Sequence, residues 1–407
     1  MPKLTARAMP AERATSQRIL IALVQVLGLA TWFSASAVSS SLQFEWKISP
    51  AETVWVTASV QVGFVVGAIA SAVLNLADRV PANVLLAVSA AGAAVAATAF
   101  ALLATGLTAA IPLRFLTGVM LAGVYPVGMK LMASWSPSID RGRWFGVLIG
   151  ALTLGSALPH LIGVLDAGWR AVILVAAGVT LAGGALSLAF IRTGPHLARS
   201  VSKFDPGYVI RMFRDPRQRL INLGYLGHMW ELYALWSWMA AFAVAALASS
   251  SSLGLNLGVF TAIGIAGVAG ALIGGWSSDR WGRARTAQAA LAISGICCVI
   301  SPFVFGAPWA IMLVVGIVWG ASVIADSGVF STMLSELVPG EYAGTALTVQ
   351  TAIGFMFTVI TIQAVPIAAA LFGWQFAFLV LAPGPVVGLL ALARFRWLEA
   401  NPNRMKT

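Results

Sequence analysis

Ionisable side chains that lie within long apolar stretches of the sequence are the first candidates for chemistry. They include Arg114, Lys130, His160, His228, Glu231 and Asp326. A charged residue at the centre of a lipid bilayer costs at least about 2.5–3.5 kcal/mol. Residues of this kind are expected to bind a charged solute, carry a proton or pair with one another.

Glu231 is the strongest candidate because it lies near the middle of the apolar stretch 220–248. His228 and Trp238 share its helical face within about 60°. A carboxyl group that gains and loses a proton during a cycle is what proton coupling requires. We predict that Glu231 couples protons or contacts the substrate, with His228 and Trp238 as further binding candidates. The alternative is a buried structural hydrogen bond, for example with His228.

Asp326 lies deep in the stretch 307–334, with Trp319 and Ser322 on its helical face. It is a second proton-coupling candidate or a structural partner for a basic residue, and Trp319 is a binding candidate. His160 follows Pro159 in another apolar stretch. It either lines a cavity, where it could carry a proton, or packs in the core.

Arg114 lies inside the stretch 109–133 and can bind an organic anion or tune the protonation of a nearby carboxyl group. The alternative is that its charged end reaches the headgroups. Lys130 is sixteen residues further on, which is about 160° around a straight helix. The two cations can share one cavity only if Pro126 kinks the helix, and Lys130 is expected to reach the headgroups.

Polar residues also line one face of two other apolar stretches. The first face carries Gln25, Trp32, Ser36 and Ser39, and the second carries Gln350, Gly354, Thr358 and Thr361. Polar faces of membrane helices point to the bundle interior. Each residue contacts the solute or bonds to a neighbouring helix, and as a set they predict a hydrated central cavity.

The elements that carry these residues are membrane-spanning helices. Of the 407 residues 59% are apolar and only 10% are charged, whereas a soluble protein carries about 25% charged residues. The stretches have spanning length and no ten-residue alternation, so helices are expected rather than a barrel. We predict twelve helices, at 18–41, 53–75, 84–106, 109–133, 144–165, 169–191, 220–248, 253–276, 286–305, 307–334, 345–371 and 375–397.

The basic residues fix the predicted orientation. They gather in the N-terminal segment, in the tail and in the loops after the second, fourth, sixth and eighth helices, while the opposite loops hold only Lys47 and Arg170. This is the positive-inside pattern, so both termini are expected in the cytoplasm. The net charge of +11 follows from this pattern and does not indicate nucleic acid. We expect lipids and a small-molecule substrate as partners, and a monomer in the inner membrane.

The chain divides into two similar halves around a basic linker. We predict a cytoplasmic segment at 1–17, a six-helix bundle at 18–191, a linker at 192–219, a second bundle at 220–397 and a tail at 398–407. Asp78-Arg79 recurs as Asp279-Arg280, and Gly168-Trp169 recurs as Gly373-Trp374. A near-constant offset of half a chain indicates duplication, and six helices per copy give both copies the same orientation.

The loop after the eighth helix carries the most specific motif, with the sequence GWSSDRWGRAR. Its key residues are Gly275, Asp279, Arg280, Gly282 and Arg283. With the repeat, this motif resembles the signature of the major facilitator superfamily. The resemblance covers about residues 18–397, and it is degraded in the first half, where only Asp78 and Arg79 survive.

The resemblance implies an all-helical fold of two six-helix bundles and a secondary transporter working by alternating access. It also implies that the motif is a conformational latch that helps to hold the outward-facing state. Physically, Gly275 would let its helix approach a neighbour closely, and Asp279 and the arginines would form the charge cluster. The residues from Gly150 to Pro159 only partly match the antiporter signature of the family, because Ala157 and Leu158 precede the proline.

These observations favour proton-coupled symport of a small organic solute, and Arg114 favours an organic anion. The alternative is a proton-coupled antiporter that exports drugs or other lipophilic compounds. The sequence has no nucleotide-binding loop and no metal-ligand spacing, so we expect no cofactor or metal and a proton gradient as the driving force. A membrane enzyme is disfavoured because only His160 and Asp326 resemble a catalytic pair, and a sensor because no soluble domain is appended.

Overall fold

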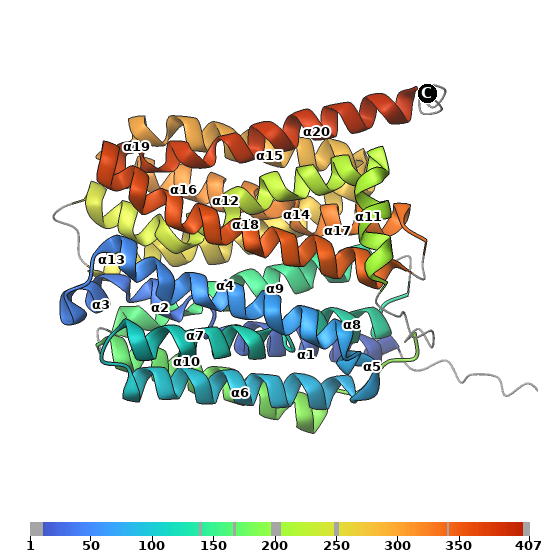
Figure 1. The fold of residues 1–407 in the computed structure, drawn as a ribbon, viewed down its shortest axis with the longest axis horizontal. Coiled ribbons are helices and arrows are strands. Elements are labelled where there is room, and N and C mark those ends of the chain that lie inside the picture. The colour runs from blue at the N-terminus through green and yellow to red at the C-terminus, as the bar shows by residue number, and fades with distance from the viewer. Residues whose placement is uncertain are drawn as a thin grey trace, which may run out of the picture.

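The computed structural model describes residues 11–137, 141–165, 168–196, 205–247, 252–339 and 342–401. These residues form helices and contain no strand. Figure 1 shows the N-terminal half, coloured blue to green, below the C-terminal half, coloured yellow-green to red. The predicted all-helical class with two helix bundles is confirmed.

The N-terminal half contains six spanning units, and three of them are interrupted or extended by short helices. Its helices are α1 (Ala11–Gly28), α2 (Ser34–Ala37), α3 (Ser39–Trp46), α4 (Pro50–Val73), α5 (Leu76–Arg79), α6 (Ala82–Leu103), α7 (Leu107–Leu121), α8 (Tyr125–Trp135), α9 (Arg141–Ile162), the 3-10 helix η2 (Gly163–Leu165) and α10 (Trp169–Phe190).

The C-terminal half repeats this plan. Its helices are α12 (Pro216–Ala246), α13 (Ser252–Val259), the π-helical η3 (Phe260–Ile265), α14 (Ala266–Trp281), α15 (Arg283–Val304), α16 (Trp309–Ala325), α17 (Ser327–Leu337), α18 (Ala343–Phe372), α19 (Trp374–Ala377), the 3-10 helix η5 (Phe378–Leu381) and α20 (Pro383–Ala400). Between the halves, α11 (Pro206–Arg214) lies in the predicted linker, of which 197–204 fall outside the described residues.

Ten helical segments within the described residues are long and apolar enough to cross a membrane. The two units that complete the predicted twelve are α1–α3 and α12. The first unit is more polar than the ten segments because three of the 18 residues of α1 are Glu12, Arg13 and Arg18. The second is more polar because α12 carries His228, Glu231 and several other polar side chains. These two helices carry much of the predicted site.

Three of the predicted helices that carry substrate-binding candidates are interrupted, a feature that the sequence does not predict. The first breaks at 29–33, between α1 and α2, the fourth at 122–124, between α7 and α8, and the tenth at Asp326, between α16 and α17. Breaks within a membrane protein need partners for the freed backbone groups. The breaks are therefore the places where polar side chains are expected to act.

One end of the bundles carries Arg79, Arg143, Arg192 and Arg283, near the labels α5, α8, α11 and α17 in Figure 1. We call this the basic end. Helices α1, α9 and α12 begin there, and α4 ends there. The direction of each helix therefore tells how far a residue lies from the basic end.

Glycine packing supports the break at Asp326. A β-carbon on Gly274 would lie 1.9 Å from the backbone oxygen of Ala325, the last residue of α16. On Gly275, the nearest neighbouring atoms would be 3.9 Å away. The prediction that Gly275 allows its helix to approach a neighbour closely is therefore corrected. Of these two positions, the one that has no room for a side chain is Gly274, where α14 packs against the end of α16.

We expect Gly274→Ala to lower the free energy of unfolding by about 1–3 kcal/mol, because a packed backbone would have to move. Gly275→Ala is the matched control and should change stability little. Thermal unfolding of both variants in detergent measures the difference. Equal stability of the two variants would contradict the packing described for α14.

Candidate functional site

A central cavity of about 460 Å³ lies between the two halves and extends toward the basic end. The N-terminal half contributes α4, the Asn75–Ala77 segment, α8 and α9, and the C-terminal half contributes α12, α16, α17 and α18. Its polar and aromatic wall residues include Asn75, Tyr125, Lys130, Tyr225, His228, Tyr233, Ser327, Ser331, Thr348 and Thr351. The cavity is large enough for a small organic molecule.

Among the described residues that line this wall, Lys130 is the only lysine or arginine. It lies on α8, and its Nζ donates to the backbone oxygen of Ala77 at the end of helix α4–α5. The prediction that Lys130 reaches the headgroups is corrected, because Lys130 lines the cavity. A lysine here can attract an anion entering from the basic end.

His228 and Asp326 form a buried pair at the cavity wall. His228 Nδ1 lies 2.8 Å from Asp326 Oδ1, and the two side chains are 2% and 1% exposed. On its other side, His228 Nε2 lies 2.8 Å from the Ser327 hydroxyl. The break between α16 and α17 places Asp326 and Ser327 on either side of the imidazole. The pair can hold a proton next to the cavity.

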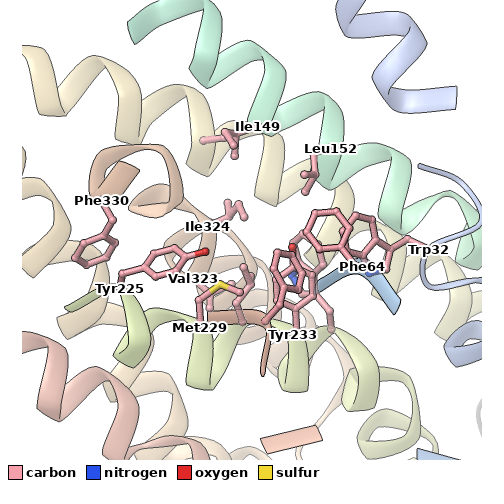
Figure 2. Close-up of a cluster of buried hydrophobic side chains, with 14 of the residues drawn as sticks. Trp32, Phe64, Ile149, Leu152, Tyr225, Met229, Tyr233, Val323, Ile324 and Phe330 are labelled. Atoms are coloured by element: carbon pink, nitrogen blue, oxygen red, sulfur yellow. The ribbon is translucent and has the colours of Figure 1, made fainter. Parts of the chain in front are cut away.

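An aromatic cluster closes the cavity at the end opposite to the basic end. We call it the aromatic seal, and it consists of Trp32, Phe33, Phe64, Tyr233 and Phe355. The ring centroids of Phe64 and Phe355 are 4.5 Å apart, and those of Tyr233 and Phe355 are 4.9 Å apart. Trp32 lies 6.1 Å from Tyr233. Figure 2 shows Trp32, Phe64 and Tyr233 together at one end of a cluster of buried hydrophobic side chains. The seal joins both halves, so the cavity has one open side.

Arg114 does not line this cavity, in contrast to its prediction as a substrate or proton site. It is fully buried, and its guanidinium donates to the backbone oxygens of Thr31, Trp32 and Val56 and to the hydroxyl of Ser34. The carbonyls of Thr31 and Trp32 belong to the break between α1 and α2. Arg114 supplies the donors that the interrupted helix needs.

Glu231 is also buried away from the central cavity, within the C-terminal half. It accepts hydrogen bonds from Ser294 (2.8 Å), Cys298 (3.4 Å) and Trp319 (2.5 Å). The predicted grouping of Glu231 with His228 and Trp238 is corrected. His228 points to Asp326, and Trp238 donates to the backbone oxygen of Ile362. Trp319 thus contacts Glu231 and not the cavity.

The other predicted polar contacts bond to neighbouring helices or to their own. Gln25 donates to Val124 O, Ser36 bonds to Thr57, Gln350 donates to Asn222, and Thr358 donates to Phe355 O. None of the four lines the cavity. These four residues therefore form hydrogen bonds within the helix bundles, which was the alternative to contact with the solute. Trp32 is at the cavity only as part of the aromatic seal.

The predicted latch residues lie at the contact between α9 and α14, which joins the two halves at the basic end. A β-carbon on Gly142 would lie 3.4 Å from the Asp279 carboxylate, so this carboxylate faces the start of α9. An anion at a helix N-terminus is stabilised. Arg283 bridges Asp279 at 3.2 Å and Glu336 at 2.8 Å.

The remaining latch candidates are less connected. Arg280 lies over the ring of Trp276, and Gly282, with φ of 92°, forms the turn before α15. In the first half, Arg79 is exposed at the end of α5, and the side chain of Asp78 lies outside the described residues.

Several cavity residues were missed by the sequence analysis, above all Tyr125, Tyr225, Tyr233 and Met229. Three of them lie on α12 at the spacing of one helical face, as Figure 2 shows for Tyr225, Met229 and Tyr233. That spacing was a usable signal. Glu231 lies on a different face of the same helix, and this face is the one that its charge indicates.

A comparison with known proteins identifies a family whose model matches this chain. The model of the Major Facilitator Superfamily matches residues 21–253 and again residues 221–407. The solved structure of the proton:xylose symporter XylE, bound to 6-bromo-6-deoxy-D-glucose, superposes with a TM-score of 0.73 over 94% of this chain and 96% of that chain, at 15% identity. At this identity the likeness shows the fold alone.

Two curated relatives are similar over part of their length. The Probable sulfoacetate transporter SauU of Cupriavidus necator is 26% identical over 58% of this chain and 60% of that protein. The Niacin transporter NiaP of Acinetobacter baylyi is 31% identical over 38% of this chain and 36% of that protein. The chain therefore matches about a third to three fifths of the length of these relatives.

Proposed function

The chain belongs to the major facilitator superfamily of multi-pass membrane transporters, and we propose that it carries a small organic carboxylate by proton-coupled symport. The observation that carries this proposal is the cavity itself. Lys130 and His228 line one space between the two halves, and His228 is paired with the buried Asp326 behind it. A cation and a proton site in the same cavity are what co-transport of an anion and a proton requires.

The relatives support the chemical class. Sulfoacetate and niacin, which the names of the two relatives give as their solutes, are both small molecules that carry a carboxylate at neutral pH. Tyrosine rings and aliphatic side chains form much of the cavity wall. Apolar walls with a few placed polar groups are typical of small-molecule sites.

Alternating access provides the cycle. The positive-inside rule puts the basic end in the cytoplasm, so the cavity faces inward and the aromatic seal closes the outer side. In the opposite state the two halves would meet across the cavity mouth at the basic end while the seal opens. The solute and a proton on His228 would cross together, and the proton would leave to the cytoplasm after the solute.

We expect His228→Gln to abolish carboxylate accumulation driven by a pH gradient, down to the level of vesicles without the protein. Solute exchange without a gradient should persist, because it needs the cavity but no net proton transfer. The measurement compares both modes in proteoliposomes with labelled nicotinate and sulfoacetate.

Two further variants distinguish the roles of the carboxyl groups of Asp326 and Glu231. Asp326→Asn should behave like His228→Gln, whereas Glu231→Gln should keep gradient-driven uptake, since Glu231 is sealed in the C-terminal half. If only Glu231→Gln lost its response to the gradient, the proton site would be Glu231 and the assignment of His228 would be wrong.

A further inference from the structure

Three helices that line the cavity continue past the aromatic seal, and each carries a buried polar group there. Ala68 on α4, Ile149 on α9 and Met229 on α12 line the cavity. Seven residues away on each helix, in the direction leading from the basic end, lie Gln61, Ser156 and Trp236. Seven residues bring a helix back to within about 20° of the same face, roughly 10 Å further along.

The groups at these positions are buried and unpaired. Gln61, Ser156 and Trp236 are 0%, 2% and 1% exposed. The amide of Gln61, the hydroxyl of Ser156 and the indole Nε1 of Trp236 have no hydrogen-bond partner among the described residues. His160 lies one turn beyond Ser156, is 2% exposed and has an unpaired Nδ1. Buried polar groups are normally paired, and each exception needs a reason.

The three helices that carry these four residues all pack against one short helix. Helix α2, which follows the break held by Arg114, packs against α4, α9 and α12. The Ser36 hydroxyl on α2 lies 2.9 Å from Thr57, one turn before Gln61 on α4. Trp236 meets the aromatic seal edge-on, with its ring centroid 5.7 Å from that of Phe33. We call Gln61, Ser156, His160 and Trp236 the outer polar layer.

We infer that the outer polar layer is the outer half of the solute path, closed in this conformation, and that it binds the carboxylate of the solute when the aromatic seal opens. The four side chains include no acidic residue, and an amide, a hydroxyl, an imidazole and an indole can each donate a hydrogen bond to an anion. Their unpaired state is explained if their partner is the solute. The class of solute rests on the proposed function, but the position of the path does not.

Cysteine labelling tests the path without any solute. The chain has only Cys297 and Cys298, both buried, and Cys297→Ser with Cys298→Ser gives a background that keeps a donor to Glu231. Ser156→Cys and Gln61→Cys are then exposed to a membrane-impermeant thiol reagent outside intact cells. Ser187→Cys, buried between α10 and α6, is the control outside the path.

A minor state is commonly populated at about 0.1–10%, so we expect both thiols to react at up to about a tenth of the rate of an accessible thiol. Ser187→Cys should stay unlabelled. If both layer variants were no more reactive than Ser187→Cys, while Ser331→Cys in the cavity reacted from the cytoplasmic side in inverted vesicles, the inference would be overturned. Two layer variants are used so that misfolding of one does not decide the test.

A second readout tests the ligand class. Addition of nicotinate or sulfoacetate should slow the labelling of Ser156→Cys several-fold. Labelling that occurs but does not respond to either carboxylate would keep the path and refute the carboxylate contact. Uptake of either carboxylate with no labelling at all would instead keep the proposed function and refute the outer polar layer.

Discussion

Lys130→Gln is expected to weaken carboxylate binding by roughly tenfold to a hundredfold. A hydrogen bond to a charged group contributes about 1.5–3 kcal/mol, and every 1.4 kcal/mol is about a tenfold change in affinity. Lys130 is the only lysine or arginine in the described cavity wall, so its loss removes the main attraction for an anion. Titration of purified protein with nicotinate or sulfoacetate measures the change.

Two variants control this experiment. Lys130→Arg keeps the charge and should retain most of the affinity, and Lys47→Gln removes an exposed lysine from the opposite end and should have no effect. Because Lys130 also donates to Ala77 O, the stability of each variant without ligand is recorded first. Full carboxylate affinity in a stably folded Lys130→Gln protein would exclude Lys130 as the anion site.

Arg114→Ala is expected to lower the free energy of unfolding by roughly 3 kcal/mol or more. The side chain makes four hydrogen bonds in a fully buried place. Hydrogen bonds in membrane proteins contribute about 0.6 kcal/mol on average and up to about 1.7 kcal/mol each, and an unsatisfied buried acceptor costs more. Thermal unfolding in detergent measures this loss.

Arg114→Lys distinguishes the two roles considered for this residue. A lysine keeps the charge but lacks the fork that reaches several acceptors at once, so it should also be destabilised. If Arg114→Lys were as stable as the wild type and only lost carboxylate affinity, Arg114 would be a binding residue. The break between α1 and α2 would then be held by other contacts.

The fold could be predicted well from the sequence because its signals are long and repeated. Apolar stretches, basic loops and the duplicated Asp-Arg pairs each report on many residues at once. The three helix breaks were not predicted, since a break at a site such as Asp326 depends on what the freed backbone contacts. Arg114, Gln25 and Gly274 provide those contacts from segments distant in the sequence.

The candidate site could be predicted only in part. The search for charges in apolar stretches found His228 and Asp326, which the structure brings together. The same search gave Arg114 and Glu231 a place in the cavity, where the structure does not put them. Periodicity gives the angle between two side chains on one helix but not the direction of the cavity. His228 and Glu231 are only about 60° apart, yet they point to different neighbours.

The most direct test of a carboxylate site is a comparison of nicotinate with nicotinamide, which differ mainly in the charged group. We predict that nicotinate or sulfoacetate raises the thermal stability of the wild type, and that nicotinamide does not. A ligand present at about 100 times its dissociation constant adds about 2.7 kcal/mol, and Lys130→Gln should remove most of that gain. Equal stabilisation by nicotinamide, or stabilisation by lipophilic cations alone, would contradict the account and favour the export of lipophilic compounds.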